Sequence, residues 1–270
     1  MKHTNIIDIE ACEAVILRET LFGNHHAADR KNSKSLDLEF ENQEIQDIGI
    51  LSNLSSYDSL TLGYNQIYDI QPLEKLTQLT RLQLNNNKIS NIHPLAHLKN
   101  LTHLDLADNS ISTISALSTV SQLRTLTLSN NHITDITALS KMHFIESLYL
   151  NNNAIHNIEP LNKIGRLAEF KTLDLSFNHI QDIDALATLK DLESLSLRAN
   201  KIHDISALKS LTKLKELYLG FNQISNVTAL AELKNLKWLG LKGNPTKKEQ
   251  ILWLQAQLPN CTICASHEDI

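Results

Sequence analysis

Apolar residues recur along most of this chain with two different periodicities. The stretch 101–120, LTHLDLADNSISTISALSTV, has apolar residues at Leu101, Leu104, Leu106, Ile111, Ile114, Leu117 and Val120. Leu104 and Leu106 follow the period of two that predicts a short β-strand. The later positions recur about every three residues, which is typical of a 3₁₀ or short helical segment. One such stretch therefore predicts a strand followed by a helical return.

The same pattern recurs at a fixed interval. An asparagine closes each strand motif, and the series is Asn65, Asn87, Asn109, Asn131, Asn153, Asn178, Asn200, Asn222 and Asn244. Subtracting neighbouring numbers gives 22 residues for seven intervals and 25 for the interval that ends at Asn178. Gln43, 22 residues before Asn65, extends the series to ten units over residues 35–244. One unit cannot bury its own apolar side chains, so stacked units with a shared core are predicted.

Polar residues at fixed places in the unit have predicted structural roles. The recurrent asparagine should bond backbone groups that the turn leaves unpaired and so form a ladder between coils. A second set stands directly before Ala-Leu or Pro-Leu, and we interpret most of its members as helix N-caps. This set is Gln71, His93, Ser115, Thr137, Glu159, Asp184, Ser206 and Thr228. The three additional residues of the long unit are expected on the convex side, as an extra helical turn near residues 163–169.

The units NKISNIHPLAHLKNLTHLDLADN and NHITDITALSKMHFIESLYLNN resemble a known repeat type. They are similar to the 22-residue repeats of bacterial internalins and of the related regulatory leucine-rich family that includes a protein phosphatase-1 subunit. The resemblance covers residues 35–265. It implies an α/β fold, a leucine-rich repeat solenoid with a curved parallel sheet on the concave face and 3₁₀ or short helical segments on the convex side. It also implies protein partners, which differ widely between members of such families.

Three parts are predicted: residues 1–34, the repeats 35–244, and residues 245–270. An open solenoid end exposes apolar side chains, so a helical cap is expected at both ends. Residues 8–22 read as the first cap helix, with a membrane-binding or partner-binding helix as the alternative, and residues 24–35 as a connector. In the last part, Thr246 is the expected N-cap with Glu249 three residues on, and Ile251, Leu254 and Leu258 share one face.

Composition narrows the classes of function. A net charge of -5 and a pI near 6.2 argue against binding to nucleic acid, which favours a basic surface. The chain opening is too acidic for a secretory signal, and no run of about 18 apolar residues is present, so we expect a cytoplasmic protein without a membrane partner. No catalytic or phosphate-binding motif occurs, and neither Cys261 with Cys264 nor the histidines have spacing that completes a metal site. No enzyme activity, cofactor or metal is expected.

The solvent-facing strand positions are the candidate binding surface. Aromatic and cationic residues gather there towards the C-terminal half, and the predicted partner-binding residues are Tyr149, Tyr218, Trp238, Arg198 and Lys242. The alternative is that these aromatics only shield the sheet. A second candidate patch comprises Asp37, Glu39 and Glu41, an acidic docking strip or hard-cation site. Phe177 and Phe221 stand one position outside the strand motif. We expect these two side chains to pack within the fold and not to bind the partner.

These observations predict a non-catalytic, monomeric scaffold that binds a protein partner on its concave face. The chain shows neither the secretion signal nor the wall anchor of surface internalins. This difference argues against a role in extracellular adhesion. Two alternatives stay open: a bacterial effector delivered to a host cell without a cleavable signal, and a regulatory subunit of an enzyme.

Overall fold

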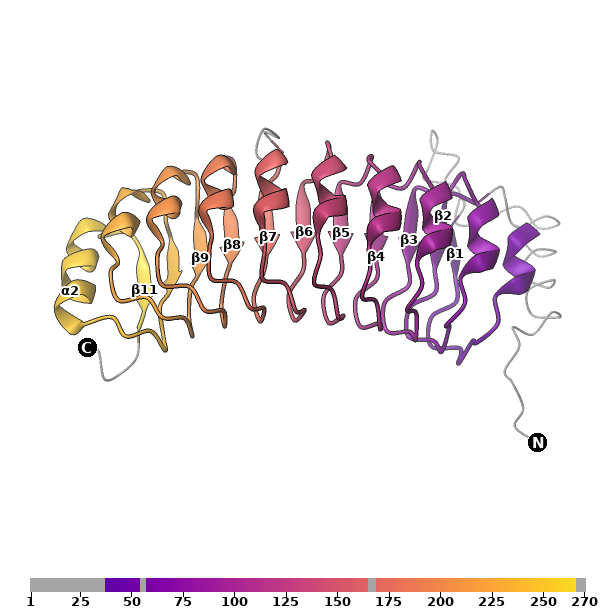
Figure 1. The fold of residues 1–270 in the computed structure, drawn as a ribbon, viewed down its shortest axis with the longest axis horizontal. Coiled ribbons are helices and arrows are strands. Elements are labelled where there is room, and N and C mark those ends of the chain that lie inside the picture. The colour runs from indigo at the N-terminus through magenta and orange to yellow at the C-terminus, as the bar shows by residue number, and fades with distance from the viewer. Residues whose placement is uncertain (1–36, 54–56, 165–168, 266–270) are drawn as a thin grey trace, which may run out of the picture.

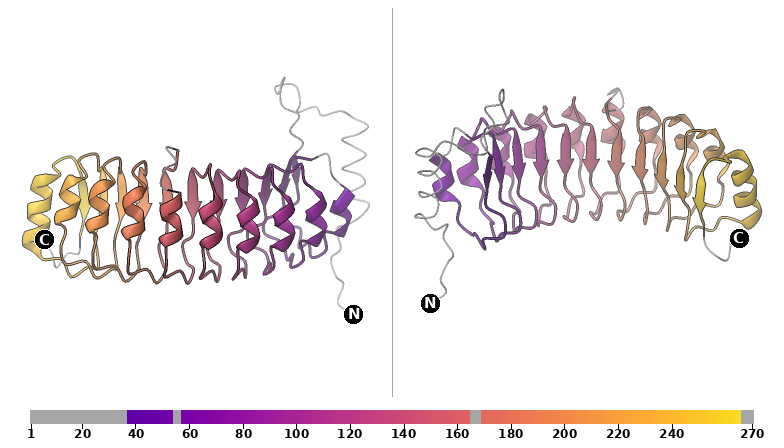
Figure 2. Two further views of the ribbon diagram at one scale, coloured as in Figure 1. Left: turned by 45° about the horizontal axis from the view of Figure 1, so that its top comes forward. Right: turned by 180° about the vertical axis from the view of Figure 1, so that it is seen from behind.

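The computed structural model describes residues 37–53, 57–164 and 169–265 of the 270-residue chain. Within these ranges the chain winds into an elongated, gently curved solenoid (Figure 1). The strands line one face and the helical segments line the opposite face, as the two further views make plain (Figure 2). The predicted α/β solenoid of parallel strands and 3₁₀ segments is therefore confirmed.

All the described strands are three residues long and belong to one parallel sheet in chain order, β1 to β11. They are β1 Asp37–Glu39, β2 Ser59–Thr61, β3 Arg81–Gln83, β4 His103–Asp105, β5 Thr125–Thr127, β6 Ser147–Tyr149, β7 Thr172–Asp174, β8 Ser194–Ser196, β9 Glu216–Tyr218, β10 Trp238–Gly240 and β11 Thr262–Cys264. Ten strands were predicted. The eleventh, β11, pairs with β10 in register, so the segment after the last repeat continues the sheet by one strand.

The return segments are five-residue 3₁₀ helices, as the period of three predicted. They are η2 Gly49–Asn53, η3 Gln71–Lys75, η4 His93–His97, η5 Ser115–Thr119, η6 Thr137–Lys141, η7 Glu159–Lys163, η8 Asp184–Thr188, η9 Ser206–Ser210 and η10 Thr228–Glu232. Each of η3 to η10 packs against its neighbours in the stack. The long repeat keeps this order, because β6 and β7 pair with Leu148 opposite Leu173. The extra turn predicted near residues 163–169 lies largely outside the described residues.

The predicted N-cap residues begin these helices but do not cap them, so that prediction was wrong. An aspartate or asparagine two residues earlier does so instead: the side-chain oxygen of Asp135, for example, accepts a hydrogen bond from the Thr137 backbone N–H at 2.8 Å. Equivalent bonds precede η2, η3, η4, η7, η8, η9 and η10. A short side chain can close this tight turn before the helix starts. Thr137 and Thr228, the first residues of η6 and η10, donate their hydroxyls to this side-chain oxygen and do not themselves cap the helix.

The core is one continuous apolar column between the sheet and the helices. In the repeat that spans residues 101–120, the side chains of Leu104 and Leu106 in the strand region are at most 2% exposed. The same holds for Ile111, Ile114 and Leu117 of the return. Because each coil contributes the same positions, every interior coil covers its neighbour on both sides, and burial on this scale is the main stabilising term of the fold.

The recurrent asparagines form the predicted ladder. Asn131 shows the pattern: its Oδ1 accepts from the Ile111 N–H of the preceding coil at 2.9 Å, and its Nδ2 donates to the Leu106 carbonyl of that coil at 3.0 Å. Nδ2 also lies 3.1 Å from the Leu128 and Ser129 carbonyls of its own coil. The same bonds to the preceding coil recur along the series. The predicted hydrogen bonds between the recurrent asparagines and the backbone of neighbouring coils are therefore confirmed.

The residue before each ladder asparagine, here called the turn position, has a left-handed backbone. Its occupants with positive φ are Tyr64, Asn86, Asp108, Asn130, Asn152, Phe177, Ala199, Phe221 and Gly243. Glycine and asparagine tolerate this conformation, whereas it costs other residues about 1–2 kcal/mol. Tyr64, Phe177 and Phe221 are large side chains at these strained positions, and each is about half exposed.

The C-terminal end carries α2, Lys248–Gln257, which buries Ile251 and Leu254 and packs beside η10. Thr246 does not cap α2, contrary to the prediction. Its hydroxyl donates to the Ile224 carbonyl at 2.9 Å, and the N-cap residue is Lys247, which makes no side-chain capping bond. The helix predicted over residues 8–22 lies outside the described residues. None of the helices in the described ranges has the length and apolar character needed to cross a membrane.

Candidate functional site

Strand register sets out the exposed positions of the sheet in columns. The central residue of each strand from β2 to β10 is buried, and its two neighbours point to the opposite face. The first and third strand residues are therefore the ones that meet solvent. Gly240 pairs with Tyr218, and Trp238 pairs with Glu216, across β9 and β10. The columns that the repeat spacing predicts are therefore the columns of the structure.

Tyr218 and Trp238 lie together around a glycine. A Cβ atom placed on Gly240 would stand 3.8 Å from Cδ1 of Tyr218 and 4.0 Å from Nε1 of Trp238, so both rings border the same small residue. Trp238 is 38% exposed and Tyr218 is partly exposed. Burial raises the pKa of Tyr218 above its ordinary value, and the neighbouring carboxylate of Glu216 acts in the same direction. We name Tyr218, Trp238 and Gly240 the aromatic patch.

Tyr149 stands apart from the aromatic patch. It is the third residue of β6, and the same column continues through Asp174 and Ser196 before it reaches Tyr218. Tyr149 is therefore three coils away, about 14 Å at the usual strand spacing. Short polar side chains separate the two places.

Arg198 follows β8 and is flanked by two rings from the turn positions of the coils on either side. Its Cζ lies 5.7 Å from the ring centroid of Phe177 and 4.8 Å from that of Phe221. Phe177 is 50% exposed and Phe221 is 46% exposed, so about half of each ring meets solvent, while Phe221 also packs against Gly243. The left-handed turn places these side chains at the edge of the sheet and out of the core. Lys242 occupies the position of Arg198 two coils later and is exposed.

A row of opposite charges lies directly before the strands. Arg124 pairs with Glu146, and Glu193 pairs with Lys215 and with Lys171, the last at 3.5 Å. These five side chains are partly or well exposed, so each pair contributes little to stability. They do neutralise most of the charge along this edge. In the part of the chain that is described, Arg198 and Lys242 have no such carboxylate partner.

The acidic strip lies at the other end of the sheet. Asp37 and Glu39 belong to β1 and Glu41 follows it, and the side chains of Glu39 and Glu41 are exposed. The side chain of Asp37 lies outside the described residues. Across the described ranges, no three His, Cys, Asp or Glu side chains are grouped so that they could hold a metal ion.

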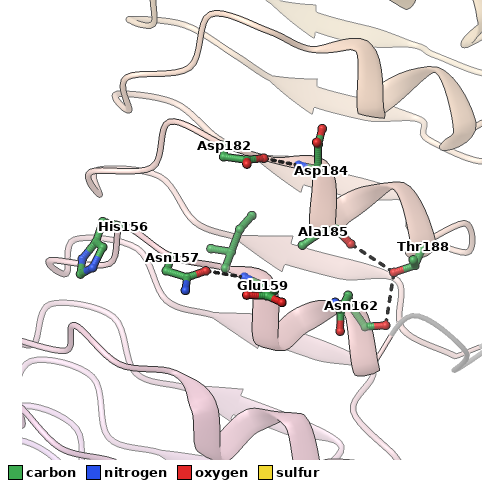
Figure 3. A pocket seen from close by; sticks show the side chains of 9 residues that line it. His156, Asn157, Glu159, Asn162, Asp182, Asp184, Ala185 and Thr188 are labelled. Carbon is green, nitrogen blue, oxygen red and sulfur yellow. Dashed lines mark hydrogen bonds between the residues drawn. The ribbon is translucent and has the colours of Figure 1, made fainter.

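A hollow lies on the helical side, between η7 and η8, where the long repeat passes (Figure 3). It has a volume of about 520 Å³ and is lined by polar side chains that the fold already uses. Asn157 accepts from the Glu159 N–H, and Asp182 accepts from the Asp184 N–H, both at 2.8 Å. Thr188 donates to backbone carbonyls of both helices. The hollow is an opening between coils whose polar groups serve the turns.

Comparison with protein families places the chain in a known group of sequences. A family model described as "Leucine Rich repeats (2 copies)" matches residues 55–97, 121–163, 171–210 and 192–232. A second, described as "Leucine rich repeat", matches residues 77–133. A search of curated proteins gave no match.

Among solved structures, the chain is similar to two internalins from Listeria monocytogenes. With InlF it shares 34% identity over 83% of this chain and 73% of that one, with a TM-score of 0.69. With internalin C2 the identity is 34% over 74% of this chain and 77% of that one, with a TM-score of 0.55. The ectodomain of the receptor kinase GASSHO1/SCHENGEN3 from Arabidopsis thaliana, solved in complex with CASPARIAN STRIP INTEGRITY FACTOR 2, shares 22% identity over 86% of this chain and 30% of that one. Its TM-score of 0.72 reflects the fold alone.

Proposed function

Because the chain belongs to the leucine-rich repeat family, in its internalin-like group, we propose that it is a non-catalytic scaffold that binds a protein partner on the concave sheet face. The observation that carries this proposal is the aromatic patch. Most other exposed strand positions hold short or polar side chains, whereas Tyr218 and Trp238 present two adjacent rings to solvent. Rigid aromatic side chains lose little entropy on docking and often dominate the energy of an interface.

The surrounding residues support a protein ligand over a small molecule. The aromatic patch lies on an open sheet face and not in an enclosed cavity, which is the shape that a protein surface can cover. Arg198 and Lys242 stand at its edge and add charged groups to an apolar centre, the usual arrangement of a protein interface. The plant receptor ectodomain with this fold was solved with its bound factor, so the fold can carry a ligand on its surface.

The test is capture of the partner followed by measurement of its affinity for matched variants. The double substitution Tyr218→Ala and Trp238→Ala should weaken binding by at least about 1–2 kcal/mol, or five- to thirtyfold, with an unchanged circular dichroism spectrum. The control is Tyr68→Ala with Trp253→Ala, which removes the same two side-chain types from exposed sites outside the strands.

Equal affinity of wild type and the Tyr218/Trp238 double variant would place the site elsewhere, and the strip of Glu39 and Glu41 would be next to test. Equal loss in both double variants would show that aromatic removal acts through the fold. We propose that the unbound protein is a monomer, which light scattering at several concentrations checks directly.

A further inference from the structure

Arg198 lies in a gap that the two phenylalanines and a small residue define. Phe177, Ala199 and Phe221 occupy the turn positions of three successive coils. Coils repeat about every 4.8 Å, so the outer two rings are about 10 Å apart and leave room for one flat group between them. The methyl group of Ala199 does not fill that room. The guanidinium of Arg198 does, at 5.7 and 4.8 Å from the two ring centroids.

Stacking of this kind leaves the hydrogen-bonding edge of the guanidinium unused. Its N–H groups lie in the plane of the group, and both ring centroids lie within about 6 Å of Cζ, the range of a cation–π interaction. Within the described residues, Arg198 forms no ion pair, and no hydrogen bond from its side chain to the protein is present. A planar fork of donors that is already held in place is the arrangement that binds a carboxylate with two parallel hydrogen bonds.

The charges nearby point to an anionic ligand. Lys242 lies two coils along the same column, with Gly220 at the position between them, and the Phe221 ring of that intermediate coil lies near Arg198 and packs against Gly243. Two acidic residues of the sheet face lie near these cations. Asp174, which pairs with Ser196, accepts hydrogen bonds on Oδ1 from the backbone N–H and the hydroxyl of Ser176, at 2.9 and 2.6 Å. Glu216 accepts a hydrogen bond from Ser194 at 3.3 Å. The neighbouring cations Lys171 and Lys215 are paired with Glu193, as described above. Within the described residues, Arg198 and Lys242 are thus two cations beside the aromatic patch without a carboxylate partner.

We infer that Phe177, Arg198 and Phe221 form a preorganised carboxylate receptor, and that the partner docks an acidic protein segment there, with a second acidic side chain on Lys242. This inference rests on the proposed function and names the chemistry of the partner. The aromatic patch would cover apolar side chains of the same segment. The two cations are two coils apart, about 10 Å, which one short segment can span.

A defined probe tests the receptor without the natural partner. A fluorescein-labelled peptide of six glutamates is titrated with the full chain at low ionic strength, and binding is followed by fluorescence anisotropy. A peptide of six glutamines is the neutral control. Arg198→Gln should weaken binding of the acidic peptide at least tenfold. The matched variant Arg124→Gln removes the same charge from an arginine that already pairs with Glu146, and it should change affinity less than twofold.

A second variant separates the stacked geometry from the charge. Phe177→Leu with Phe221→Leu keeps every charge and should weaken peptide binding about three- to tenfold, because Arg198 must then be ordered when the ligand binds. Circular dichroism confirms that the variants are folded. Equal weakening by Arg198→Gln and Arg124→Gln, full affinity of the leucine variant, or no difference between the two peptides on wild type would each overturn the receptor. None of these results touches the proposed scaffold function, which depends on the captured partner and on Tyr218 and Trp238.

Discussion

Replacing one ladder asparagine tests how much the buried amide column stabilises the solenoid. Asn131→Ala removes four hydrogen bonds from an asparagine that is 5% exposed. The carbonyls that lose a donor each keep another: Leu106 keeps Asn109, Leu128 keeps Asn153, and Ser129 keeps the Asp108 N–H. The Ile111 N–H has no second acceptor of this kind, so it becomes a buried unpaired donor.

The magnitude follows from this difference. A buried donor without a partner costs about 1–3 kcal/mol, and each carbonyl that keeps one of two donors loses about 0.5 kcal/mol at the lower end of the usual range. Together these give a destabilisation of about 3 kcal/mol. The matched control is Asn100→Ala, which removes one exposed bond to the Thr77 carbonyl, at 2.9 Å, and should cost less than about 1 kcal/mol.

Urea unfolding followed by circular dichroism is the assay, with the midpoint and the slope compared between variants. Asn131→Ala should lower the midpoint clearly, whereas Asn100→Ala should leave it close to wild type. If the two variants unfold at the same midpoint, the reasoning that assigns the stabilising role to the buried N–H acceptor is wrong.

Three further predictions concern single positions. Gly243 has φ +77, and a Cβ there would stand 2.8 Å from Phe221, so Gly243→Ala should cost about 1–2 kcal/mol in urea unfolding, whereas Ala199→Gly at the equivalent turn position should add about 0.5 kcal/mol. Burial raises the pKa of Asp105 above the ordinary 3.8, so its charged form disfavours folding. Asp105→Asn should therefore raise the melting temperature at pH 7, and the gain should vanish as the pH falls through the raised pKa to 3. Leu254→Ala should cost about 2–5 kcal/mol if α2 caps the last coil as predicted, which thermal unfolding measures.

The sequence predicted the fold well because one rule, repeated along the chain, specifies each coil. The interval between asparagines gives the strand register directly, so the placement of Tyr218 beside Gly240 and of Trp238 beside Glu216 followed without any tertiary information. The aspartates and asparagines that open the 3₁₀ helices, such as Asp135, were missed because a general N-cap rule was applied to helices of only five residues.

The carboxylate receptor could not be predicted from the periodicity. It depends on side chains from three coils and on the left-handed turn that directs Phe177 and Phe221 outwards. The usable signal was present in the series Phe177, Ala199, Phe221, where a small residue lies between two large ones. This pattern predicts where the two rings lie only when the φ angle of the turn position is known. With an extended backbone the same side chains would point in another direction.

The stack of coils has a consequence for the response of this protein to mechanical force. The strand pairs and the main helix contacts join each coil only to the next one, and no described strand pairs with a distant coil. Tension applied to the two ends would therefore detach coils successively from the ends, each releasing 22 residues, or 25 for the long repeat, which is about 75–85 Å of extended chain. Extension in an optical trap should proceed in steps of nearly equal length at modest force, and the coils that remain stacked would keep their exposed columns, and any bound partner, in place.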